Sequence, residues 1–183
     1  MNVFKLDRDP RDGFDFALVD ESSDRSIWNG FNGVPLAAQW RTPKITAVDV
    51  NDAEAEPGDF ALLGTVPVFS LRTLEAMLHL LRPNGEVLPL HYQGTEYFAY
   101  NVTSVIPALD EESSILRRFP GGDVVMSISK YAFKPDIVRD TAVFKIPQLP
   151  KAFVFLTDIF VERVQSAGLT GFSFPLLWNS GSP

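Results

Sequence analysis

The stretch SLRTLEAMLHLLRPNGEVLPLHYQGTEYFAYNVTSVI, residues 70–106, decides the fold class of this chain. Its opening segment, residues 70–81, predicts a helix that Ser70 can cap and whose positive end lies near Glu75. The apolar side chains that share one face of this helix are Leu71, Leu74, Leu78 and Leu81. Arg82 falls in the last turn, and Pro-Asn-Gly at residues 83–85 ends the helix.

Two strands follow this helix. The runs EVLPLHY (residues 86–92) and TEYFAYNVTSVI (residues 95–106) are rich in β-branched and aromatic residues, and only Gln93-Gly94 separates them. A two-residue connection containing glycine is typical of a hairpin. Because the predicted strands outnumber the helices along the chain and are mostly linked by hairpins, we expect an α+β fold with a largely antiparallel sheet.

Further elements lie on both sides of this unit. We expect strands at residues 45–50, 123–133, 142–146, 152–156 and 172–178, and a short helix at residues 108–119 capped by Asp110. In the strand at residues 123–133, alternation places Val125, Ser127, Ser129, Tyr131 and Phe133 on one face.

A last helix begins at Thr157 or Asp158 and runs through Ala167, with Phe160, Val164 and Ala167 on its inner face. Gly168 suits the left-handed residue after it. The prediction is an α+β fold, mainly an antiparallel sheet with two or three helices, in one domain spanning residues 1–183, of which residues 1–56 form an acidic, turn-rich N-terminal part.

The composition is that of an ordinary globular protein of 183 residues, with 45% hydrophobic and 21% charged residues. Cysteine is absent, which excludes disulfides and thiolate chemistry and suits the cytoplasm. The chain starts with scattered charges instead of a signal-peptide core, and its apolar runs are too short for a membrane helix. We therefore expect a cytoplasmic protein without a membrane partner.

The net charge of −7 is concentrated near the N-terminus. Residues 1–60 contain 12 acidic and 6 basic side chains (12 − 6 leaves −6), whereas residues 61–183 contain 11 and 10 (−1). Phosphate backbones are repelled by such a surface, so direct nucleic-acid binding is disfavoured. A basic protein partner would be attracted, although acidic surfaces also serve solubility alone.

Catalytic patterns are scarce. The two histidines, His79 and His91, cannot form a three-histidine zinc site, and we expect His79 to be a hydrogen-bonded structural residue beside the apolar helix face. Neither the serine-hydrolase elbow nor the glycine-rich phosphate loops occur. The carboxylates of residues 110–112 fit a helix start, and those of residues 49–59 lie in polar sequence that would not hold one of them protonated. The chain is not expected to be an enzyme or to need a cofactor or a metal.

Several stretches together resemble a known family. They are GDFALLGTVPVFSLRTLEAMLHLLRPNGEVLPL (residues 58–90), EYFAYNVTSVIPALDEESS (residues 96–114) and VFKIPQLPKAFVFLTDIFVERVQSAGLTGFSFPLLW (residues 143–178). In their order and spacing they resemble the bacterial polymorphic-toxin immunity proteins of the eleventh catalogued immunity family, formerly a domain of unknown function. The resemblance covers residues 57–178 and leaves the acidic N-terminal part outside.

The resemblance implies a protein that binds and neutralises the toxin encoded beside it. Such toxins are typically domains of secreted effectors, often of a type VI secretion system and frequently nucleases, and the family supplies no catalytic motif. A nuclease is basic around its cleft, so an acidic surface would be steered toward it. The residues predicted to bind the partner are Asp49, Asp52, Glu54, Glu56 and Asp59, with Trp28 or Phe31 as anchors.

Inhibition could plug the toxin's cleft or block its assembly, and the sequence specifies neither this choice nor the oligomeric state. Two alternatives stay open at this point. One is a metal-assisted hydrolase that uses the surface carboxylates, which calorimetry with divalent cations would test. The other is a small-ligand module without a toxin partner.

Overall fold

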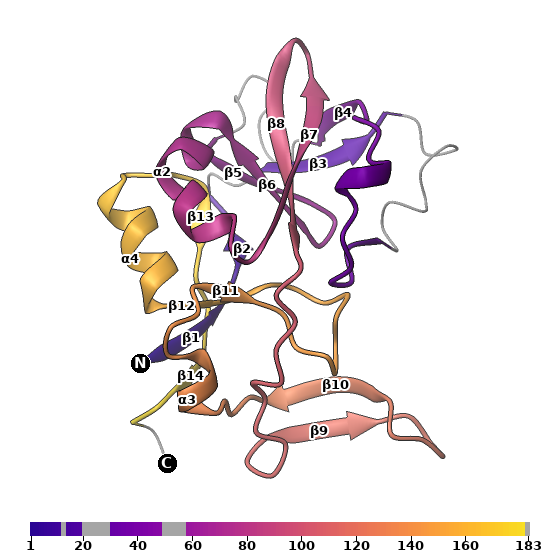
Figure 1. The fold of residues 1–183 in the computed structure, drawn as a ribbon, viewed down its shortest axis with the longest axis vertical. Coiled ribbons are helices and arrows are strands. Elements are labelled where there is room, and N and C mark those ends of the chain that lie inside the picture. The colour runs from indigo at the N-terminus through magenta and orange to yellow at the C-terminus, as the bar shows by residue number, and fades with distance from the viewer. Residues whose placement is uncertain (12–13, 20–29, 49–57, 182–183) are drawn as a thin grey trace.

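The computed structural model of the protein describes residues 1–11, 14–19, 30–48 and 58–181. Its largest element is a six-stranded sheet with the spatial order β4-β3-β5-β6-β8-β7 (Figure 1). All neighbouring pairs in this sheet are antiparallel except β3 and β5, which run parallel. The strands are β3 (Phe14–Leu18), β4 (Ile45–Val48), β5 (Phe60–Leu63), β6 (Val66–Ser70), β7 (Gly85–Tyr92) and β8 (Thr95–Val102). The predicted α+β fold with a mainly antiparallel sheet is confirmed.

The segment from residue 70 to residue 102 forms the predicted helix followed by the predicted two-stranded hairpin. Helix α2 (Leu71–Leu81) begins after Ser70, whose Oγ accepts a hydrogen bond from the Thr73 backbone N–H. Gln93 and Gly94 both have positive φ, at 44° and 84°, as the two-residue turn between β7 and β8 requires. The predicted apolar face of α2 is partly wrong, because Thr73, Leu74, Met77 and Leu81 are the buried residues while Leu71 is 53% exposed. The helix is rotated toward Thr73, whose hydroxyl reaches the Asp59 carbonyl oxygen.

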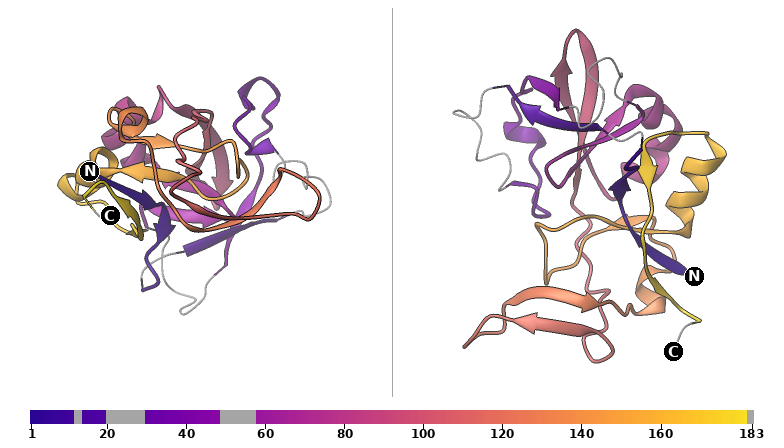
Figure 2. Two further views of the ribbon diagram at one scale, coloured as in Figure 1. Left: turned by 90° about the horizontal axis from the view of Figure 1, so that it is seen from below. Right: turned by 180° about the vertical axis from the view of Figure 1, so that it is seen from behind.

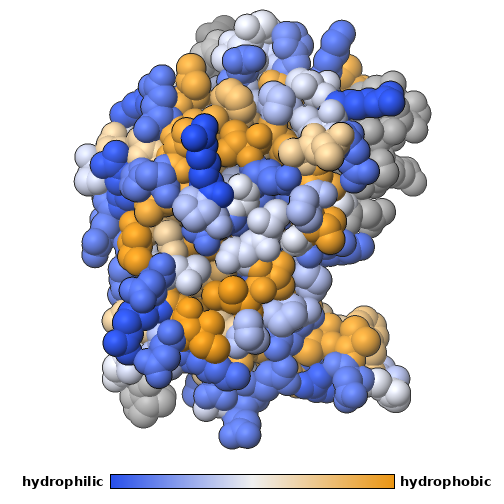
Figure 3. All heavy atoms as spheres, in the orientation of Figure 1, coloured by the Kyte–Doolittle hydropathy of each residue, from blue (hydrophilic) through white to orange (hydrophobic). Residues whose placement is uncertain are grey.

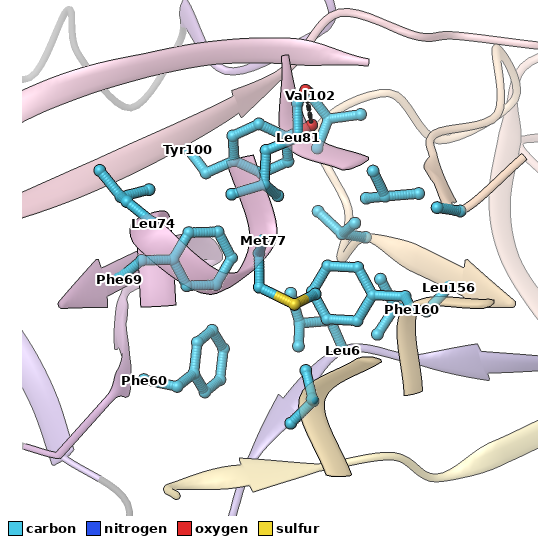
Figure 4. Packing of buried hydrophobic residues seen from close by; sticks show 14 residues of the cluster. Leu6, Phe60, Phe69, Leu74, Met77, Leu81, Tyr100, Val102, Leu156 and Phe160 are labelled. Atoms are coloured by element: carbon cyan, nitrogen blue, oxygen red, sulfur yellow. Dashed lines mark hydrogen bonds between the residues drawn. The ribbon is translucent and has the colours of Figure 1, made fainter. Parts of the chain in front are cut away.

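Helix α4 (Asp158–Ser166) packs beside α2 and carries Phe160, Val161 and Val164 into the interior. It ends as predicted, with Gly168 at φ 60° and the Leu169 N–H donating to the Val164 carbonyl oxygen. Figure 4 shows Met77 of α2 pointing toward Phe160 of α4, with Phe60 and Phe69 of the large sheet beside them. The two helices therefore cover one face of this sheet and close the main core.

A smaller sheet of four strands has the order β11-β12-β1-β14 and joins both ends of the chain. Figure 2 shows β1 and β14 side by side, and their register pairs Asn2 with Asn179. The strands are β1 (Asn2–Lys5), β11 (Val143–Phe144), β12 (Phe155–Thr157) and β14 (Leu176–Asn179). The predicted terminal strand at 172–178 is in fact divided around Pro175 into β14 and a two-residue strand, β13 (Phe172–Ser173), which pairs with β2 (Asp7–Arg8).

The described parts of the first third belong to the same body as the rest. Strands β3 and β4 extend the large sheet, and the short 3₁₀-helix η1 (Ala37–Gln39) lies against β7. The acidic third is therefore no lobe of its own where the structure describes it.

The predicted helix at residues 108–119 is wrong. Asp110 does accept hydrogen bonds from the N–H groups of Glu112 and Ser113, as a cap would, but only one turn forms. The chain then extends as β9 (Ile115–Arg118), which pairs with β10 (Val125–Lys130). Irregular register on both sides of residues 127–128 breaks the predicted alternation, so Ser127 and Ser129 are exposed while Tyr131 and Phe133, beyond the strand, enter the core. A short helix, α3 (Pro135–Val138), follows.

Candidate functional site

Five of the seven predicted partner-binding residues lie outside the described residues: Trp28, Asp49, Asp52, Glu54 and Glu56. The other two, Asp59 and Phe31, lie in the described part, and both are largely buried, with 7% and 4% of their surface exposed. The structure does not bring these two side chains together on one surface, because they belong to opposite sides of the large sheet. Their predicted role toward a partner stays a prediction.

Asp59 joins the two helices. Its carboxylate lies 2.6 Å from the Arg72 guanidinium and accepts hydrogen bonds from the Ser70 hydroxyl at 3.0 Å and from the Thr170 N–H at 3.0 Å. Arg72 also donates to the carbonyl oxygens of residues 167 and 168 at the end of α4. The carboxylate therefore links the start of α2 to the turn after α4 and stabilises the packing of these two elements.

Phe31 packs edge-to-face on Trp40, with ring centroids 6.0 Å apart. The Trp40 indole N–H donates to the Pro89 carbonyl oxygen at 2.9 Å, so both rings cover the face of the large sheet opposite α2. The Phe31 carbonyl oxygen in turn accepts a hydrogen bond of 2.7 Å from the Lys145 ammonium group. These contacts fasten the described part of the N-terminal third to the rest of the chain.

Lys145 is a buried cation with 4% of its surface exposed. Its Nζ donates to the carbonyl oxygens of Phe31 and Pro150, at 2.7 and 2.9 Å. Burial lowers the pKa of Lys145 to about 8. A lysine with this pKa can act in catalysis, but the ammonium group of this one donates to two backbone carbonyl oxygens. It serves as a tie between the segment after residue 30 and β11.

Glu86, which is partly buried, links the start of η1 to β7. Its carboxylate accepts hydrogen bonds from the N–H groups of Leu36 and Ala37, at the start of η1, and from the Asn101 amide. Burial pushes the pKa of Glu86 upward, but these hydrogen bonds outweigh burial and hold the pKa below its ordinary value. The charge of Glu86 is thus used to cap η1.

The two histidines lie on different elements of the fold. His79 is exposed on α2 and not a bonded structural residue as predicted, and His91 is exposed on β7. Within the described ranges no group of three or more His, Asp or Glu side chains could hold a metal ion. In the same part of the chain, no helix is long and apolar enough to cross a membrane.

The β9–β10 hairpin, here called the arm (residues 115–130), projects from the body and was missed as a candidate site. It forms a two-stranded sheet that pairs with no other described strand (Figure 1). Three large apolar side chains are exposed on it, Ile115 at 58%, Phe119 at 49% and Val124 at 65%. Figure 3 shows apolar atoms where the arm lies, below an indentation that separates it from the upper body.

The arm is basic although the chain is acidic. It contains Arg117, Arg118 and Lys130 against Asp123, a balance of 3 − 1 = +2. Arg118 is engaged at the tip end of β9, where it contacts Glu111 at 2.6 Å and the Asp123 carbonyl oxygen. The pKa of Glu111 is lowered, mainly by a hydrogen bond from the Gln148 amide, so its negative charge is retained there.

A hollow of about 450 Å³ lies at the root of the arm, between the end of β10 and the edge strand β14. Its walls are mostly apolar and aromatic, including Tyr131, Phe133 and Trp178, and Asp110 and Lys130 contribute one charge of each sign. A second hollow of about 490 Å³ shares Asp110 and is lined by Glu111 and Lys134.

The sequence signal that could have located the arm is the turn FPGGDV (residues 119–124) between two short apolar runs. Gly121 has φ 78°, and the Phe119 N–H donates to the Val124 carbonyl oxygen, so the turn does close a hairpin. Before this turn, acidic residues precede two arginines, which is the charge order of a helix. This pattern led to the prediction of a helix in place of the first strand of the arm.

Residues 89–176 match the sequence model of a family described as Immunity protein family (Imm11). The resemblance stated from the sequence is confirmed over these residues, a narrower range than the predicted 57–178. The match contains the arm and most of the residues that line the two hollows, and it excludes the acidic N-terminal third. A comparison with curated proteins finds no match.

Proposed function

Since residues 89–176 match the Imm11 immunity family, we propose that this protein is an immunity protein that binds and neutralises a cognate toxin. The family match is the observation that carries the proposal. It implies an inhibitor that acts by binding and not an enzyme.

The surface of the described residues supports a binding role. Apolar side chains of the arm are exposed beside cations, which is the combination found at protein interfaces. The buried Lys145 and Asp59 and the partly buried Glu86 accept or donate hydrogen bonds within the protein and hold its segments together. These charged side chains thus stabilise the fold, and the exposed apolar side chains of the arm are available to a partner.

The finer proposal concerns the toxin. We propose a secreted antibacterial effector, such as a nuclease delivered by a type VI secretion system, that is met in the cytoplasm of the cell making this protein. The support is electrostatic, because residues 1–60 carry a balance of −6 and a nuclease is basic around its phosphate-binding cleft. Asp49, Asp52, Glu54 and Glu56 would steer the encounter, and the bound complex would either plug the cleft or prevent toxin assembly.

Co-expression with the neighbouring gene tests the proposal. The neighbour's product should kill a bacterial host when expressed alone and spare it when this protein is present, and the two proteins should co-purify. A neighbour that is harmless, or a lethal one that is neither neutralised nor bound, would contradict the immunity role. Reversal of the four acids to lysine tests electrostatic steering separately from the immunity role. An unchanged association rate and salt dependence would exclude steering by these residues.

A further inference from the structure

The arm is an unusual construction for a stable protein surface. A lone two-stranded hairpin is marginal in water, and this one is supported by few contacts. Leu116 and Ile128 oppose each other across the arm and pack against the cluster around Phe155, and Arg118, at the tip end of β9, pairs with Glu111. At its tip, Phe119 and Val124 are 49% and 65% exposed, whereas the neighbouring Val125 is buried.

Apolar exposure is concentrated on this element. Of the ten large apolar side chains exposed among the described residues, Ile115, Phe119 and Val124 belong to the sixteen residues of the arm. Phe119 and Val124 flank the tip turn and are joined through the Phe119 N–H and Val124 carbonyl oxygen, so their side chains leave the backbone close together. A partner that covered them would remove two half-exposed apolar groups from water at one point, as interface anchors do.

The charges beside these side chains specify the partner's chemistry. Arg117 lies opposite Ser127 and two residues before Phe119, whereas Lys130 lies opposite Ile115 at the root of the arm. Neither cation forms an ion pair among the described residues. A surface that accepts the arm must therefore provide an apolar hollow with acidic side chains on its rim. The phosphate-binding face of a nuclease is basic and would repel these cations.

We propose that the arm docks its tip into an apolar, acid-rimmed hollow of the cognate toxin, outside any phosphate-binding cleft. This inference rests on the proposed immunity function and adds the surface and the chemistry of the contact. Phe119 and Val124 supply the buried anchors, and Arg117, two residues before Phe119, pairs with the acidic rim. The acidic N-terminal third is then free to face a different, basic region of the same toxin.

The test uses the full chain and the purified toxin domain in titration calorimetry. Phe119→Ser combined with Val124→Ser should weaken binding by about 30-fold or more, the effect expected for anchor residues. The matched control is Leu71→Ser, because Leu71 is 53% exposed in the first turn of α2, far from the arm in the fold, and its replacement should leave the affinity unchanged.

Charge is tested separately with Arg117→Glu, which should weaken binding about 10-fold at low salt and less at 0.5 M salt. Arg41→Glu makes the same charge change at another exposed arginine and should not weaken binding. Circular dichroism melting curves that match the unmodified protein show that each variant is folded, and Arg117→Glu keeps the apolar contacts if the serine variant does not fold.

The outcomes distinguish the two levels of the proposal. Failure of the unmodified protein to bind or neutralise the toxin contradicts the immunity function itself. Normal binding by the unmodified protein and by both arm variants overturns the role of the arm and leaves the immunity function standing. Light scattering that shows a dimer of the free protein, lost in the arm variants while toxin affinity is kept, would assign the arm to a second copy of this chain and would also overturn the inference.

Discussion

Replacement of the buried Lys145 by methionine should remove a specific dependence of stability on pH. Lys145 has a pKa of about 8 in the folded protein, whereas an exposed lysine has a pKa of 10.5. The difference, about 2.5 pKa units, corresponds to roughly 3 kcal/mol of unfavourable free energy while the folded-state lysine is charged. Because the side chain is 4% exposed, solvent screens little of this cost.

The sign follows from proton binding. Below pH 8 both states carry the charge, and the folded state bears the full cost of burying it. Between pH 8 and 10.5 the unfolded chain binds more protons than the folded protein, so the free energy of unfolding rises with pH. From pH 7 to pH 9.5 this single group should raise the stability of the unmodified protein by about 2 kcal/mol.

Urea unfolding at pH 7, 8, 9 and 9.5 measures the effect as the difference between Lys145→Met and the unmodified protein. At pH 7 the variant escapes the charge burial but leaves the Phe31 and Pro150 carbonyl oxygens without their donor, at about 1–3 kcal/mol each. The absolute difference at one pH is therefore a balance, and the slope is the informative quantity. Burial raises the pKa of Tyr100, whose effect begins near pH 10 and is common to both proteins. Stability curves that run parallel between pH 7 and 9.5 would refute the assignment of a neutralisable lysine to this site.

Three other predictions concern the ties that hold the fold together. Asp59→Ala should destabilise the protein by about 2–4 kcal/mol in urea unfolding, because Thr170, Ser70 and Arg72 lose their acceptor. The control Asp136→Ala removes only an exposed ion pair and should change the stability by less than about 0.5 kcal/mol. Gly85→Ala should cost more than about 2 kcal/mol in the same assay, because its Cβ would lie 2.3 Å from the Asn101 carbonyl oxygen, while Gly122→Ala meets only open space and an atom at 3.9 Å and should be nearly neutral. Glu86→Gln should flatten the acid side of the pH–stability profile. The lowered folded pKa of Glu86 gives stability that is present above its ordinary pKa of 4.5 and is lost as the pH falls through the folded value. An unchanged dependence of stability on pH in the acid range would contradict the capping role of its charge.

Local chemistry made residues 70–102 and 157–171 predictable. In both segments an apolar periodicity marks a helix and a glycine with positive φ marks the turn, and Ser70 also caps α2, so local sequence and tertiary structure favour the same elements. Residues 108–119 failed because Asp110 satisfies two N–H groups as a helix cap does, yet Arg118 is used across the turn by Glu111 and not at a helix end. The local hydrogen bonds of Asp110 were predicted correctly, but the pairing of β9 with β10 determines the structure of this segment.

The roles of buried polar residues depended on long-range pairing and escaped sequence reasoning. Lys145 contacts Phe31 across 114 residues, Glu86 contacts Leu36 across 50, and Asp59 contacts Thr170 across 111. No periodicity or motif marks such pairs, because each partner is a backbone group that any residue provides. The same limitation made Asp59 look like a member of a solvated acidic run.

The distribution of charge gives the two proposed contacts different ranges and different duties. An acidic third with a balance of −6 acts over about a Debye length, roughly 8–10 Å at physiological salt, and can raise the rate of encounter with a basic toxin. The arm has a balance of only +2 and must act at contact, where Phe119 and Val124 leave water. Mutations of the acidic third should therefore change the association rate and its salt dependence, while mutations of the arm tip should change the dissociation rate. Because the family match includes the arm and excludes the acidic third, these two rate constants separate the contact that lies in the matched region from the one outside it.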